Sequence, residues 1–250
     1  MPGPEAEARA SAVVDYYERY WSEGFWADNP YERWKLDLVR SAARRLGSNA
    51  RVLDVGCGDG WLLEELARSG LRCEGLDVSG EAVAIATRRG LRARRTDLDG
   101  TTLPVDDGSF DLVLCLDVLE HLFAPDRVML ELRRAVSPTG RVIIAVPNGL
   151  NLFNRLAFLS GRHVDVMDKA HLGGHPFSEH LRFFSRDVLE RSLRDARLRP
   201  VSRDFFFPRQ LTDGRFRAAP WLARAVTAPR LHQRMPSLFA LAFLYECAPA

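Results

Sequence analysis

Short apolar runs alternate with segments of helical amphipathic spacing through the middle of the chain. The apolar run at residues 52–55 is followed by Trp61–Ala67, where apolar residues recur at helical intervals. The next run, residues 71–79, precedes a helical pattern over residues 81–89, which Gly90 ends. Such alternation predicts an α/β protein with a doubly wound, mostly parallel sheet.

The same alternation continues toward the C-terminus. The third strand is expected at residues 91–96, and the fourth lies in the unit formed by residues 109–122. Ser185 occupies the N-cap position of a clear helix and Asp187 its first turn. The remaining expectations are helices at 128–136 and 185–196, a turn at 138–140, and strands at 141–148, 198–207 and 238–247.

A turn rich in glycine joins the first strand to the first helix. Its pattern is Gly56-x-Gly58-x-Gly60, and glycine there permits positive φ and lets a ligand approach the backbone. A dinucleotide fingerprint would need G-x-G-x-x-G, but Trp61 stands where its third glycine would fall. Asp54 and Asp59 add negative charge that disfavours a phosphate and suits a cationic ligand.

These residues resemble the first motif of the class I S-adenosylmethionine-dependent methyltransferases, close to (V/I)LDxGCGxG. The segment at residues 109–122 is similar to the family's FDxVxxxxxLEH segment. The resemblance spans five ordered units over residues 52–148. It implies a Rossmann-like, doubly wound, seven-stranded sheet whose last strand is antiparallel, with S-adenosylmethionine as the cofactor.

The resemblance also assigns cofactor-binding positions. Asp77 lies 17 residues beyond Gly60, where an acidic residue accepts hydrogen bonds from ribose hydroxyls. Asp97 is expected near the adenine amino group, with Asp99 as the alternative. The full expected set is Asp54, Gly56, Cys57, Gly58, Asp77, Val78, Asp97, Leu98 and Leu116.

The end of the fourth strand carries the candidate chemistry. If a helix begins near Asp117, then Asp117, Glu120 and His121 share one face of it. With His180 they resemble the metal-binding arrangement of ubiquinone-biosynthesis and small-RNA O-methyltransferases. Mg²⁺ or Mn²⁺ would suit these oxygen and nitrogen ligands. Without a metal, Glu120, His121 and His180 are the candidates for contacting the acceptor and removing its proton.

Composition bounds the remaining alternatives. At 250 residues and a net charge of +2, the chain makes no electrostatic case for nucleic acid. Its four scattered cysteines, without a CxxC pair or signal peptide, predict reduced thiols in the cytoplasm. No apolar stretch is long enough to span a membrane, while peripheral membrane contact and oligomer formation stay open.

Two flanking regions differ from the core. Residues 1–40 are expected to form a tail and helical cap, in which Trp21 and Trp34 either pack on the sheet or close the cofactor site. Residues 41–250 are expected to form the methyltransferase domain. Insertions are expected near 149–181, which holds four of the six histidines, and near 208–236, which suits a short amphipathic helix.

The predicted function is methyl transfer from S-adenosylmethionine to a hydroxyl of a small molecule, such as a sugar, a phenol or a lipid-linked intermediate. The alternatives are an N-methyltransferase of amino sugars and a non-catalytic protein that binds S-adenosylmethionine. A further hypothesis is a nicotinamide-dependent oxidoreductase, which would be indicated if NAD protects the protein.

Overall fold

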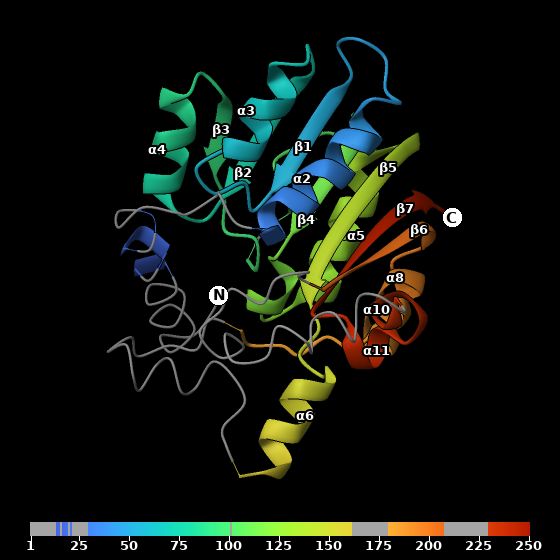
Figure 1. Cartoon of the computed structure of the whole chain (residues 1–250). Helices are drawn as coiled ribbons and strands as arrows, with labels where there is room; N and C mark the ends of the chain where they lie inside the picture. The colour runs from blue at the N-terminus through green and yellow to red at the C-terminus, as the bar shows by residue number, and fades with distance from the viewer. Residues whose placement is uncertain are drawn as a thin grey trace.

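A seven-stranded sheet forms the centre of the molecule (Figure 1). The computed structural model describes residues 14, 15, 17–19, 21, 30–100, 102–161, 180–207 and 230–250. The strand order is β3-β2-β1-β4-β5-β7-β6, and β7 is antiparallel to both of its neighbours. The strands are β1 Arg51–Val55, β2 Arg72–Asp77, β3 Arg92–Arg95, β4 Phe110–Leu116, β5 Val136–Pro147, β6 Leu198–Phe206 and β7 Ala242–Pro249.

Helices connect the strands and cover both faces of the sheet. They are α2 Pro30–Ala43, α3 Trp61–Ala67, α4 Gly80–Arg88, the 3₁₀ helix η1 Leu119–His121, α5 Pro125–Ala135, α6 Leu152–Leu159, α8 Arg186–Asp195, α10 Leu231–Arg234 and α11 Pro236–Phe239. The predicted doubly wound, mostly parallel sheet with an antiparallel last strand is therefore confirmed.

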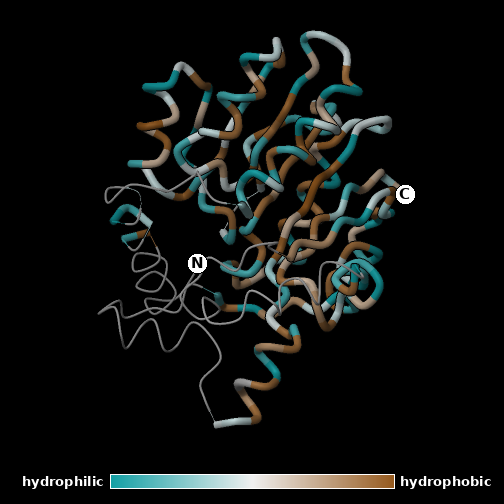
Figure 2. The backbone as a smooth tube through the Cα atoms, viewed as in Figure 1, coloured by the Kyte–Doolittle hydropathy of each residue, from teal (hydrophilic) through white to brown (hydrophobic). Residues whose placement is uncertain are grey.

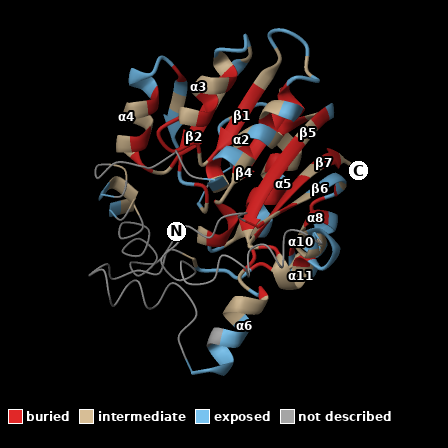
Figure 3. Cartoon of the chain, viewed as in Figure 1, coloured by how far each residue is buried: buried red, intermediate tan, exposed pale blue. Residues whose placement is uncertain are grey.

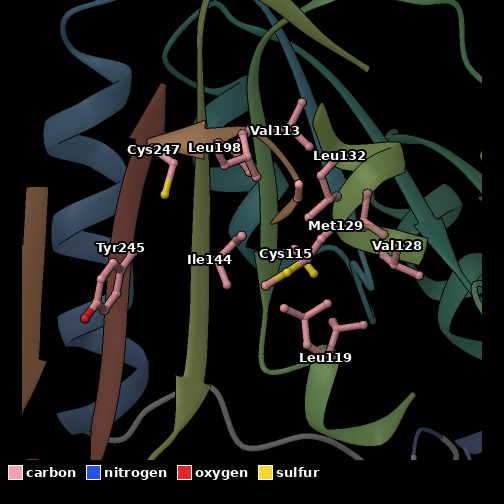
Figure 4. Close-up of a cluster of buried hydrophobic side chains, with 14 of the residues drawn as sticks. Val113, Cys115, Leu119, Val128, Met129, Leu132, Ile144, Leu198, Tyr245 and Cys247 are labelled. Carbon is pink, nitrogen blue, oxygen red and sulfur yellow. The ribbon is translucent and has the colours of Figure 1, made fainter. Parts of the chain in front are cut away.

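Alternating side chains of the central strands divide between two cores. Val113, Cys115 and Ile144 point to the face covered by α5 and α8, where they pack with Met129 and Leu132 (Figure 4). The intervening residues of the same strands point to the face covered by α2 and α3. Because both faces are covered, the central strands are mostly apolar, and their middle residues are buried (Figures 2 and 3).

Two local expectations were wrong. The turn expected at residues 138–140 lies inside the twelve-residue strand β5, where the pairing with β4 is irregular because Phe110 pairs with Val136 and Leu112 with Arg141. The last strand begins at Ala242 rather than Leu238, because Pro236 starts the short helix α11. Neither difference moves the carboxyl end of a parallel strand, where ligands bind in such sheets.

The expected boundary between residues 40 and 41 falls inside α2, which packs on the sheet through Val39 and Ala42. The division into cap and domain therefore remains a prediction. Of the two expected insertions, α6 is described and projects from the sheet (Figure 1). Of the second insertion, residues 208–229 lie outside the described residues, and the described end holds the short helix α10. Residues 1–13 of the expected N-terminal tail also lie outside them. None of the helices in the described part is both long and apolar enough to cross a membrane.

Candidate functional site

A cavity of about 620 Å³ lies at the carboxyl ends of β1, β2 and β4. Every residue predicted to bind the cofactor, a metal or the acceptor lines it. These residues are Asp54, Gly56, Cys57, Gly58, Asp77, Val78, Asp97, Leu98, Leu116, Asp117, Glu120, His121 and His180. The structure thus brings together five separate segments of the chain, although their binding roles remain predictions.

The glycine turn approaches its neighbours too closely for side chains. Gly56 has φ +83° and Gly58 has φ +52°, both in the left-handed region that favours glycine. A Cβ atom on Gly56 would collide with Val118, and one on Gly58 would collide with the ring of Trp21. The glycines are therefore required by the fold and by the crowded wall of the cavity.

Asp77 ties two loops of the cavity together. One carboxylate oxygen accepts a hydrogen bond from the Gly58 backbone N–H at 2.8 Å, and the other accepts from the Ser79 N–H at 2.9 Å. Burial raises the pKa of Asp77, although these backbone hydrogen bonds oppose the increase. Each oxygen keeps a further lone pair, so the carboxylate can still accept hydrogen bonds from a ligand.

Asp54 is buried beside Asp77 at the end of β1. Burial, followed by the negative charge of Asp77, raises the pKa of Asp54 to about 7, while Lys35 opposes the increase. A ligand that carries positive charge would favour the ionised form. The expectation that this turn suits a cation is consistent with that electrostatic environment.

The structure separates the two candidates for the adenine contact. The Asp99 carboxylate accepts hydrogen bonds from the backbone N–H groups of Phe123 and Ala124, both at 3.0 Å, so it holds the loop before α5. The Asp97 carboxylate accepts a hydrogen bond from the Asp99 N–H at 3.0 Å. Asp97 is exposed and lines the cavity. Both residues line the cavity, and the assignment of Asp97 to the adenine remains a prediction.

The helix expected from Asp117 does not begin there. Asp117 has φ +55°, and only Leu119–His121 form a single 3₁₀ turn. The Asp117 carboxylate instead accepts hydrogen bonds from the Tyr31 hydroxyl and the Lys35 ammonium, each at 2.5 Å. The prediction that Asp117 shares a helical face with Glu120 and His121 was therefore wrong, because residues of α2 hold Asp117 in another conformation.

Glu120, His121 and His180 form a separate cluster. A potential ligand atom from each lies within 4.8 Å of the others, and the imidazole rings are 5.0 Å apart between centroids. The backbone carbonyl of Glu120 accepts hydrogen bonds from the N–H groups of Leu181 and Arg182, at 2.7 and 3.0 Å. These two bonds fasten the segment that carries His180 beside η1.

The Glu120 side chain is the least satisfied group in the described part of the cavity. It is only 1% exposed, and neither carboxylate oxygen has a hydrogen-bond partner. The nearest cationic candidate, His121 Nε2, is 3.9 Å from Oε1. Burial, followed by repulsion from Asp117, raises the pKa of Glu120 well above its ordinary value.

Sequence patterns missed the contribution of α2. Lys35 is buried and also pairs with Glu32 at 2.9 Å, so one ammonium joins two carboxylates beside the cavity. Burial lowers its pKa, but the charges of Asp117 and Glu32 outweigh that effect and raise it. Lys35 is one of only two lysines in a chain otherwise supplied with arginine, which was the available signal.

The N-terminal segment, defined here as the described residues 14, 15, 17–19 and 21, also reaches the cavity. Tyr17 and Trp21 line it, and the Tyr17 ring meets the His121 ring edge-on at 5.9 Å. Trp34, the other tryptophan expected near the cofactor, packs on Phe206, and its Nε1–H donates to Asp204 at 2.9 Å. Of the loop histidines, only His180 lies within the described residues.

Comparisons with known proteins agree with this site. A family model for a methyltransferase domain matches residues 25–203. The chain is 33% identical over 136 residues to a ubiquinone biosynthesis O-methyltransferase of Xanthomonas oryzae pv. oryzae, covering 52% of this chain and 56% of that protein. It is 29% identical to a ubiquinone biosynthesis O-methyltransferase of Paraburkholderia phymatum, covering 68% and 77% respectively. The chain thus spans about half the length of the first of these relatives.

Solved structures show the same fold at low identity. A geranyl diphosphate C-methyltransferase from Streptomyces coelicolor is similar with a TM-score of 0.65 and 16% identity, covering 96% of this chain and 98% of that one. A magnesium protoporphyrin IX methyltransferase from Synechocystis has a TM-score of 0.62 and 17% identity, covering 96% and 99%. The chain belongs to the methyltransferase domain family, and part of it is similar to the ubiquinone-biosynthesis O-methyltransferases.

Proposed function

We propose that the chain transfers the methyl group of S-adenosylmethionine to a hydroxyl group of a small molecule. One observation carries this proposal: a single cavity joins the glycine turn and Asp77 to the cluster of Glu120, His121 and His180. We call the part around Asp54, Gly58 and Asp77 the cofactor side. The cluster of Glu120, His121 and His180 is the acceptor side.

The charge of the cavity supports a sulfonium cofactor. Seven carboxylic side chains and one lysine line its described part. The carboxylic residues are Glu32, Asp54, Asp77, Asp97, Asp99, Asp117 and Glu120. A positively charged sulfonium would be attracted to such a lining, whereas a phosphate would be repelled. A neutral hydroxyl acceptor fits the same electrostatic environment.

The acceptor side contains groups that can take a proton. In a displacement at the methyl carbon, the sulfur departs with the bonding electrons as the acceptor oxygen attacks, and the hydroxyl proton must leave. The His121 imidazole is the more available base at neutral pH, because burial favours the protonated form of Glu120. Glu120 can then orient the acceptor, and its unpartnered oxygens leave it able to bind a hydroxyl.

The same cluster fits a divalent metal ion. Its donors are one carboxylate and two imidazoles, while Asp117 is engaged by Lys35 and Tyr31. That set suits Mn²⁺ better than Mg²⁺, which prefers oxygen ligands. When bound by Glu120, His121 and His180, a metal would supply positive charge that lowers the pKa of an acceptor hydroxyl.

An amine acceptor is the second candidate. The acidic lining would also attract an ammonium group, and an amine needs less help than a hydroxyl in losing its proton. The non-catalytic alternative is that the chain binds S-adenosylmethionine but transfers no methyl group. The finer expectations of a small-molecule acceptor, no nucleic-acid partner and a cytoplasmic location belong to this proposal as well.

The first experiment is calorimetric titration with S-adenosylhomocysteine, using NAD as the comparator. Binding of S-adenosylhomocysteine alone supports the cofactor, whereas binding of NAD alone would contradict it. A panel of matched acceptors, each pair differing only in a hydroxyl or an amino group, then tests the acceptor atom. Turnover of the amino member alone would replace O-methylation with N-methylation, and tight binding without turnover over the panel would favour the non-catalytic alternative.

A further inference from the structure

Glu18 of the N-terminal segment binds the first turn of α4. Its carboxylate accepts hydrogen bonds from Ser79 Oγ at 2.9 Å, the Gly80 N–H at 2.8 Å and the Glu81 N–H at 2.7 Å. Ser79 already serves as the helix's own N-cap by accepting from the Ala82 N–H. Glu18 therefore satisfies N–H groups that α4 leaves open, at the end where a helix favours negative charge.

The neighbours of Glu18 reach into the cavity. Tyr17 and Trp21 are four residues apart in helical backbone and so share one face. On that face, the Trp21 ring lies against Gly58 and the Tyr17 ring meets His121 edge-on. One short segment thus touches both the cofactor side and the acceptor side.

Hydrogen bonds link the first turn of α4, which Glu18 binds, to the cofactor side. The Ser79 N–H donates to Asp77, whose other carboxylate oxygen binds the Gly58 N–H. Trp21 rests on Gly58, so Glu18 and Trp21 hold the N-terminal segment to the two loops that Asp77 links. Releasing Glu18 would loosen the segment where it covers both loops.

We propose that Glu18 is a positioning residue of the methyl-transfer site, which seats Trp21 and Tyr17 over the cavity and slows the departure of the cofactor product. This inference rests on the proposed function, because it takes the cavity to hold S-adenosylmethionine and S-adenosylhomocysteine. Its chemical basis is a carboxylate bound by two helix N–H groups and one hydroxyl.

Glu18 remains ionised under working conditions. Burial alone would raise its pKa, but the hydrogen bonds from Glu81, Gly80 and Ser79, with the charge of Arg95, outweigh burial and hold the pKa below its ordinary value. The hydrogen bonds from α4 to the charged Glu18 carboxylate are consequently present at neutral pH. Substitution, rather than a change of pH, is the appropriate way to release it.

The test is the dissociation rate of S-adenosylhomocysteine, measured by stopped flow. Release should be about 10-fold faster from Glu18→Ala, because hydrogen bonds to a charged group are lost. Trp21→Ala should give a similar increase, and the double variant should be no faster than the faster single variant, because both changes release one segment. Glu81→Gln is the matched control, since it removes a side-chain charge from the same helix turn but keeps the backbone N–H that donates to Glu18.

A second readout needs no ligand. Hydrogen exchange in a peptide spanning residues 14–21 should be faster in Glu18→Ala than in wild type or Glu81→Gln. Unchanged exchange and unchanged release in Glu18→Ala would overturn the role of Glu18, as would equal acceleration in Glu81→Gln or additive effects in the double variant. If wild type fails to bind S-adenosylhomocysteine while exchange still responds to Glu18→Ala, the proposed function fails, and the effect on product release fails with it.

Discussion

The cofactor side and the acceptor side of the cavity differ in how far their polar groups are satisfied. On the cofactor side, both oxygens of Asp77 accept backbone hydrogen bonds, and Asp59 accepts from the Trp61 N–H while pairing with Arg89. On the acceptor side, Glu120 is more deeply buried but has no hydrogen-bond partner at either oxygen among the described residues. Buried polar groups normally find partners, so an unsatisfied carboxyl at a cavity marks where a ligand is expected.

This difference separates the roles of the two sides. Asp77, held by two backbone hydrogen bonds, presents a preformed surface, as a constant cofactor requires. A side with an unsatisfied carboxyl and two histidines is prepared for proton transfer or for a metal. Lys35 lies between them, because it pairs with Asp117 at the end of β4 and lowers the pKa of Asp54 at the end of β1.

Glu120→Gln should have the largest effect on activity. We expect turnover to fall about 100-fold or more, because the amide lacks the O–H of the protonated carboxyl that orients the acceptor and cannot bind a metal as a carboxylate does. Affinity for S-adenosylhomocysteine should be unchanged. Steady-state kinetics and calorimetry measure the two quantities.

Asp126→Asn, at an exposed site on α5, is the control for Glu120→Gln. A chelator separates the two mechanisms, since it should stop turnover only if the cluster holds a metal. In that case His180→Ala should reduce turnover as strongly as Glu120→Gln. Loss of cofactor affinity in Glu120→Gln would contradict the division between the two sides.

Lys35→Met should have the largest effect on stability. Removing the ammonium leaves the buried Glu32 and the half-buried Asp117 without their cation, and breaking a buried pair in this way costs about 3 kcal/mol. Urea denaturation measures the change in the free energy of unfolding. Arg44→Met, at an exposed position next to α2, should leave that energy nearly unchanged. Equal stability of both variants would show that Lys35 does not hold the two sides together.

Asp77→Ala should weaken binding of S-adenosylhomocysteine about 10- to 100-fold, because ligand donors and the backbone donors of Gly58 and Ser79 lose their acceptor. Calorimetric titration measures the dissociation constant. Glu74→Gln is the control, because Glu74 lies on the same strand as Asp77 but pairs with Arg51 away from the cavity. The affinity of this variant for S-adenosylhomocysteine should match that of wild type. An unchanged constant in Asp77→Ala would remove this residue from the cofactor side.

A further expected effect is a pH dependence of stability from Asp54. An unfolded aspartate loses its proton near pH 4, whereas Asp54 in the folded chain does so near pH 7. Between these values the folded state binds more protons, so the free energy of unfolding contributed by Asp54 falls as pH rises. Asp54→Asn should therefore show a shallower decline between about pH 5 and pH 7 in urea titrations. Identical slopes would mean that Asp54 is not buried in its acid form.

The sequence predicted which residues gather on the cofactor side, because its signals there are local, while their binding roles stay predictions. The glycines of the turn, the strand ends at Asp54 and Asp77, and the helices between them follow from neighbouring residues, and all nine expected cofactor positions line the cavity. The acceptor side was predicted less completely. Asp117 was placed on a helix because spacing alone cannot show that α2 supplies Tyr31 and Lys35 to hold it in another conformation.

The sequence alone therefore determined the α/β alternation, the glycine turn and the candidate residues at the strand ends, since apolar periodicity and glycine conformation are properties of short segments. Tertiary structure decided which carboxylates are paired and which are left for a ligand. Pairing joins residues far apart in the chain, as Lys35 joins Asp117 and Glu18 joins Ser79, and burial then sets their charge. Those contacts arise only when the packed layers exclude water, and no local pattern records them.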